Sequence, residues 1–108
     1  MTEESSPNPY LSESDIRIFE RAIAYVEAFG ANLHALGSHG GPRCLVGCIE
    51  SACFGDVSAL SGMAWNLIEL PGNISPADWT AGLDSDTAVE EFVDFYESMI
   101  IKIRELMA

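Results

Sequence analysis

The sequence predicts an all-α protein: a compact single-domain bundle of about four helices plus one short turn. Two observations predict this fold class. Apolar residues recur at steps of three and four along most of the chain, and the segments between these stretches are short and rich in glycine and proline. No segment alternates apolar and polar residues for long enough to indicate a β-sheet.

The last helix, from Asp86 to Met107, is the longest, and we expect it to lie at the centre of the bundle. Asp86 and Thr87, followed by Glu90, form a capping pattern in which side-chain oxygens accept the free N–H groups of the first turn. The face that should enter the core is apolar throughout and consists of Val89, Phe92, Val93, Tyr96, Met99, Ile100, Ile103, Leu106 and Met107.

Two helices are predicted in the first half of the chain. The first begins at Ser12 or Ser14 and ends near Phe29, where Gly30 suits the left-handed backbone that closes a helix. The second spans residues 43–54, and Gly47 should allow another helix to approach it closely. Its inner face consists of Leu45, Cys48, Ile49 and Ala52.

The third helix is predicted over residues 57–70, with Asp56 as its N-cap. A single turn should follow from Ser75 to Trp79, and Gly82 should end it. We expect Trp65 and Trp79 to cover the core.

The chain has 108 residues, which is enough for one hydrophobic core. We expect a flexible acidic tail over residues 1–11 and one helical domain over residues 12–108. The polar N-terminus does not resemble a signal peptide, and no apolar run approaches the ~20 residues that span a bilayer. The three cysteines are expected to be reduced thiols. These features favour the cytoplasm of a bacterial host.

The net charge is extreme: 17 acidic residues against five Lys and Arg give −12. Such a field repels nucleic acid and anionic membranes and attracts basic protein surfaces. The composition therefore argues against direct nucleic-acid or membrane binding. It favours a basic protein surface as the partner.

Four carboxylates of the last helix should form a strip along its outer side. We name Asp86, Glu90, Asp94 and Glu97 the acidic strip. One helical turn rises about 5.4 Å, a spacing similar to that of phosphates along a nucleic-acid strand. Ile101 falls within the same arc and Phe95 at its margin, which indicates a contact surface. A merely solvated face is the alternative explanation. Self-association as a homodimer through Phe95, Tyr96 or Ile101 is another.

These features predict a non-enzymatic interaction protein without a cofactor. By analogy of class, we expect a phage or mobile-element inhibitor that occupies the basic nucleic-acid-binding surface of a host defence protein. It would act by nucleic-acid mimicry, as anti-CRISPR or anti-restriction proteins do. The acidic strip, Ile101 and Phe95 would bind the partner.

Two alternatives centre on the cysteines. Cys44 and Cys48 are one turn apart, so a small ligand- or metal-binding domain could use both thiolates together with His39. A cysteine-dependent enzyme could instead use Cys44 as its nucleophile, because Cys44 lies in the first turn of its helix beside Arg43. His39 could then act as the base. Buried structural thiols are the simpler interpretation of all three cysteines.

The segment Arg43-Cys44-Leu45-Val46-Gly47-Cys48 resembles the R-C-L-x-G helix start of a family of small, uncharacterised bacterial and phage-borne helical proteins. The pair Trp65-Asn66 and the helix opening Thr87-x-x-Glu90-Glu91-x-Val93 are similar to two further features of that family, although about twenty residues separate them here. The resemblance implies a helical fold and no particular activity.

Overall fold

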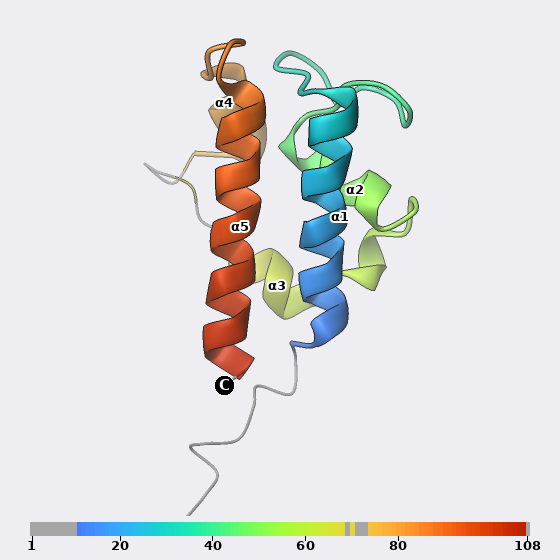
Figure 1. Cartoon of the computed structure of the whole chain (residues 1–108), viewed down its shortest axis with the longest axis vertical. Helices are drawn as coiled ribbons and strands as arrows, with labels where there is room; N and C mark the ends of the chain where they lie inside the picture. Colours follow the sequence, from blue (N-terminus) through green and yellow to red (C-terminus); the bar gives the residue numbers. More distant parts are fainter. Residues whose placement is uncertain (1–10, 69, 71–73, 108) are drawn as a thin grey trace, which may run out of the picture.

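The computed structural model describes residues 11–68, 70 and 74–107. Within these ranges the chain forms five α-helices, one short 3-10 turn and no β-strand, which confirms the all-α prediction (Figure 1). The elements in chain order are α1 (Glu13–Phe29), α2 (Leu45–Ala52), η2 (Val57–Ala59), α3 (Gly62–Asn66), α4 (Pro76–Ala81) and α5 (Ala88–Met107). Among the described helices, none is sufficiently long and apolar for a membrane span.

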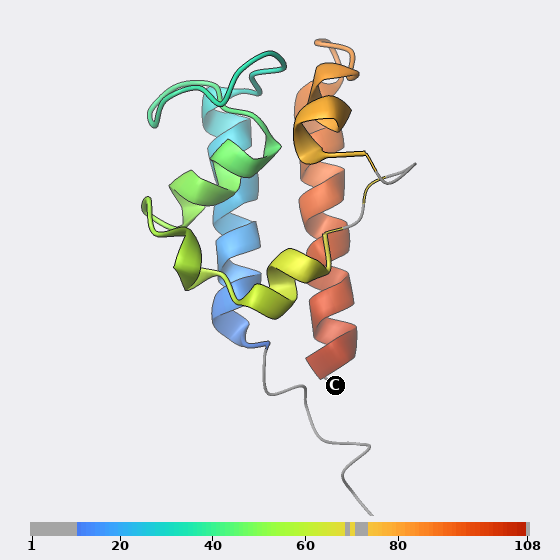
Figure 2. The same ribbon diagram turned by 180° about the vertical axis from the view of Figure 1, so that it is seen from behind.

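Helices α1 and α5 lie side by side and run antiparallel along the longest axis of the molecule (Figure 1). Figure 2 shows α2, α3 and α4 together on one side of this pair. Helix α1 packs extensively against both α5 and α2, so it shares the central position that the sequence assigns to α5 alone. No other described element covers the second side of the pair in either view.

The apolar face of α5 enters the core largely as predicted. Phe92, Tyr96, Met99 and Ile103 are fully buried. The hydroxyl of Tyr96 donates a hydrogen bond of 2.6 Å to the backbone oxygen of Leu45, which joins α5 to the start of α2. Leu106 departs from the prediction: it is 40% exposed near the end of the helix.

Ser12, one of the two predicted starts, is the N-cap of α1, and the carboxylate of Asp15 accepts its N–H. Leu11, which the sequence analysis assigns to the tail, is buried against the core. The other residues of the predicted tail lie outside the described ranges. Gly30 ends α1 with a positive φ of 87°, as expected.

The prediction of a single helix over residues 57–70 is wrong, because the chain forms η2 and α3 there instead. Leu60 adopts an extended backbone between them and is buried. Ser61 then starts a new helix, since its hydroxyl accepts from the N–H of Ala64 at 3.1 Å. The carboxylate of Asp15 accepts the N–H of Ser61 at 3.0 Å. A tertiary hydrogen bond and the burial of Leu60 therefore override the helical periodicity.

Helix α5 begins two residues later than predicted. The carboxylate that holds the turn before it belongs to Asp84 and not to Asp86. Asp84 accepts the N–H of Asp86 at 2.8 Å through its side chain and the N–H of Thr87 through its backbone oxygen. Asp86 therefore lies in the turn before α5. The short turn predicted from Ser75 is confirmed as α4, which ends at Gly82.

Gly47 permits a close approach, although the neighbour is a loop and not the predicted helix. A Cβ atom at this position would lie 2.9 Å from the backbone oxygen of Leu36 and 2.9 Å from Cβ of Arg43. The loop is also held where the N–H of Cys44 donates to Leu36 O and the N–H of Asn32 donates to Arg43 O. Gly47 thus positions the loop that carries His39.

Candidate functional site

The acidic strip is exposed to solvent. Glu90, Asp94 and Glu97 lie on one exposed side of α5, within an arc of about 60° at the usual helical rotation. Asp86 is exposed in the preceding turn. None of these carboxylates forms an ion pair with another described residue.

Helix α1 adds to this surface a carboxylate that the sequence analysis missed. Glu20 of α1 and Glu97 of α5 both line a groove of about 380 Å³, whose remaining lining is Ile23, Ile100 and Ile101. We call this the α1–α5 groove. Glu20 also lies 3.9 Å from Arg104, but both side chains are more than half exposed, so solvent screens the pair. Both helices are recognisable from the sequence. If they are paired antiparallel, Glu20 of α1 is expected near the acidic strip of α5.

The two apolar candidates of α5 differ in their positions. Ile101 is 58% exposed, in agreement with its predicted place within the acidic arc, and it also lines the groove. Phe95 is partly buried, and its ring lies 5.9 Å from that of Trp79 and 5.8 Å from that of Tyr96. Phe95 therefore points toward α4 and not toward the acidic strip. Tyr96 is fully buried, so of the three residues suggested for a homodimer only Ile101 is exposed.

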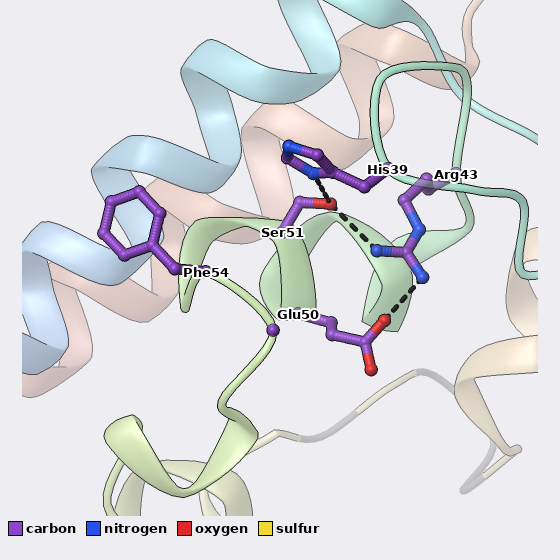
Figure 3. Close-up of a pocket in the computed structure, with 6 residues that line it drawn as sticks. His39, Arg43, Glu50, Ser51 and Phe54 are labelled. Atoms are coloured by element: carbon purple, nitrogen blue, oxygen red, sulfur yellow. Dashed lines mark hydrogen bonds and ion pairs between the residues drawn. The ribbon is translucent and has the colours of Figure 1, made fainter.

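A polar cluster on α2 and the preceding loop is the second candidate site (Figure 3). Arg43 is only 5% exposed, and its Nη2 atom forms an ion pair with Glu50. Its Nη1 atom donates to Ser51 Oγ at 2.9 Å, and His39 Nδ1 lies 2.9 Å from the same oxygen. Because Arg43 can only donate, the Ser51 hydroxyl proton is free to point at His39.

His39 and Arg43 are candidates on sequence alone, but their clustering with Glu50 and Ser51 was not predicted. The relevant signal is the spacing, because Gly47, Glu50 and Ser51 share one side of α2 and Arg43 precedes that helix, four residues before Gly47. Since Gly47 has no side chain, the arginine can lie along the helix and reach the other two residues. The ring of Tyr25 stacks on His39 at 5.8 Å, and its hydroxyl donates to Gly41 O.

The cysteines occupy separate environments. Cys48 is fully buried, its Sγ lies 3.5 Å from the backbone oxygen of Arg43, and burial raises the pKa of its thiol to about 12. Burial also raises the pKa of Cys53. Cys44 is half-buried and lines a different cavity from His39. Among the described residues, no three His, Cys, Asp or Glu side chains are grouped in a way that could hold a metal ion. The predicted combination of Cys44, Cys48 and His39 is therefore not assembled.

Comparison of this chain with protein families, with curated proteins and with solved structures finds no match. The resemblance of the Arg43–Cys48 segment to a family of small helical proteins has no supporting match.

Proposed function

We propose that this chain is a non-enzymatic binding protein that docks on a basic surface of a partner protein through the acidic strip and the α1–α5 groove. The observation that carries the proposal is the groove itself, which is lined by three isoleucines and by one carboxylate from each helix. Exposed apolar side chains surrounded by charge are typical of contact surfaces.

The chemistry of this face favours one kind of occupant. A partner residue with an apolar body would fill the space between Ile23, Ile100 and Ile101, and flanking Arg or Lys side chains would meet Glu20 and Glu97. Arginine can present two parallel N–H donors to each carboxylate. A second copy of the chain is less favourable, because it would place like charges opposite each other in a protein of net charge −12.

We further propose that the partner is a nucleic-acid-binding protein and that the acidic strip competes with nucleic acid for its basic surface. Carboxylates that recur about every 5.4 Å along α5 provide a spacing similar to that of backbone phosphates. The proposed mode of action is that of nucleic-acid mimics that inhibit host defence proteins, and the support for it is an analogy of charge and shape.

Affinity capture from cells of the source organism, with competition by nucleic acid, tests this function. We expect immobilised protein to retain a basic nucleic-acid-binding protein, and we expect added DNA or RNA to release it. A variant carrying Glu90→Gln, Asp94→Asn and Glu97→Gln should retain at least ten times less. A control with the same charge change at exposed sites elsewhere (Glu13→Gln, Asp78→Asn and Glu91→Gln) should retain nearly as much as the unmodified chain. Equal loss in both variants, or retention unaffected by nucleic acid, would refute the proposal.

A further inference from the structure

We propose that the cavity beside α2 binds a small organic anion that carries an aromatic ring. Its anionic group would lie next to Arg43, Ser51 and His39, and its ring would lie against Phe54. This site is separate from the α1–α5 groove and does not depend on the partner proposed above.

Two adjoining hollows form the cavity. One has a volume of about 480 Å³ and is lined by His39, Arg43, Glu50, Ser51, Phe54 and Gly55. The other has a volume of about 300 Å³ and is lined by Arg21, Ala24, Tyr25, Phe29, His39, Ser51, Ala52 and Phe54. The lining of the second hollow is almost wholly apolar, whereas polar side chains contribute a substantial part of the lining of the first. Their combined size and mixed lining are typical of small-molecule sites.

The charge of this lining is opposite to that of the whole chain. Arg21, Arg43 and His39 line the two hollows together with one carboxylate, that of Glu50. The chain has only five Lys and Arg residues and a net charge of −12. The gathering of two arginines and a histidine around one cavity therefore makes it a local site for an anion.

The side chain of Arg43 is held in place, and some of its N–H groups have no hydrogen-bond acceptor among the described residues. Gly47 accommodates its side chain, and Glu50 and Ser51 each accept one of its five N–H groups. Its Nε atom is buried and makes no hydrogen bond to any described residue. This Nε atom lies against Gly47, so the remaining N–H groups on Nη1 and Nη2 are the ones that could meet a ligand. A guanidinium held in this way recognises an anion with little loss of entropy.

Phe54 supplies the apolar part of the site. Its side chain is 81% exposed, and its backbone has a φ of 56°, which bulky residues rarely adopt. The guanidinium carbon of Arg21 lies 4.9 Å from the centre of the ring, which fixes one face of the aromatic group. Strained backbone and an exposed aromatic at a cavity mouth are typical of ligand clamps. Figure 3 shows Phe54 on the opposite side of Ser51 from Arg43, and all three residues line the same hollow.

Titration of the full chain with benzoate, followed by NMR of the backbone amides of Ser51, Phe54 and Gly55, tests this site. Benzamide has the same ring without the charge, and inorganic phosphate has charge without a ring. We expect saturable shifts with benzoate, at least ten-fold weaker binding of benzamide, and binding of phosphate that is weaker than that of benzoate.

Phe54→Ala is the informative variant, because an exposed side chain can be removed without opening the core. It should weaken benzoate binding at least five-fold, whereas Leu36→Ala, an exposed control that lines another cavity, should leave it unchanged. The proposal would be overturned if benzoate gave no saturable shifts, if benzamide or phosphate bound as tightly, or if Phe54→Ala bound like the unmodified chain.

Discussion

The carboxylate of Asp15, in the first turn of α1, accepts the backbone N–H of Ser61 at the start of α3. The same carboxylate accepts the N–H of Ser12 at 3.1 Å and is 1% exposed. One side chain thus caps α1 and fixes the point at which the chain enters α3. This contact links the first turn of α1 to the first residue before α3.

Asp15→Ala should lower the free energy of unfolding by about 2–3 kcal/mol, because it removes a helix cap and leaves the N–H of Ser61 without its partner. Urea denaturation followed by circular dichroism measures this loss. Glu13→Ala, an exposed change in the same turn, should stay within about 0.5 kcal/mol of the unmodified chain. A loss below about 1 kcal/mol for Asp15→Ala would show that the contact contributes little.

Two glycine substitutions should have opposite effects on stability. Gly47→Ala should destabilise the fold by about 1–3 kcal/mol, because the added methyl group would lie 2.9 Å from Leu36 O. Gly62→Ala should stabilise it by about 0.4–1 kcal/mol, since nothing lies within 4 Å of the added atom. Thermal unfolding of the two variants in parallel checks both signs. A stabilising Gly47→Ala would contradict the tight approach of the loop to α2.

Stability should fall at alkaline pH. The thiol of Cys48 has a pKa of about 12 in the folded chain and an ordinary value of 9.0 when unfolded, so the folded state holds a proton that the unfolded state releases. The stabilisation is complete below pH 9 and is lost as the pH rises toward 12. The slope approaches about 1.4 kcal/mol per pH unit in this window.

Chemical denaturation at several pH values between 8 and 11 measures this dependence. Cys48→Ala should give a shallower slope than the unmodified chain. A residual slope should remain, because burial also raises the pKa of Cys53 and that of Tyr96. Identical slopes for the two proteins would show that the Cys48 thiol is not protected in the folded state.

Thiol labelling should distinguish the three cysteines. Cys44 is half-buried, whereas Cys48 and Cys53 are buried and have raised pKa values. A thiol reagent at pH 8 should therefore modify one cysteine in the folded protein and the other two only in denaturant. Peptide mass spectrometry identifies the labelled position. Modification of Cys48 before Cys44 would contradict the burial of Cys48 in the core.

The sequence predicts those parts of the fold that depend on local periodicity and local capping. Helices α1 and α5 have long apolar faces, and Gly30 ends α1 through the positive φ that glycine readily adopts. The helix over residues 57–70 could not be predicted correctly, because its division depends on Asp15, a residue distant in sequence.

The candidate sites can likewise be predicted only where their residues lie within one helix. The acidic strip is visible in the sequence because its residues share one helix. The contribution of Glu20 to the groove requires the packing of α1 on α5, and the position of Phe95 depends on Trp79 in α4. The cluster around Ser51 depends on a loop that returns His39 to α2. Sequence periodicity alone does not give these tertiary contacts.

The most direct test of the proposed docking surface uses a defined basic helix. A helical peptide with arginines flanking one central leucine should bind the chain more tightly than the same peptide with serine in place of leucine, and added salt should weaken both complexes. Isothermal titration calorimetry should show at least a ten-fold loss of affinity for Glu90→Gln, Asp94→Asn and Glu97→Gln together. The control variant with Glu13→Gln, Asp78→Asn and Glu91→Gln should change less than two-fold. Equal affinities for the two variants and no preference for the leucine peptide would contradict binding at the α1–α5 groove.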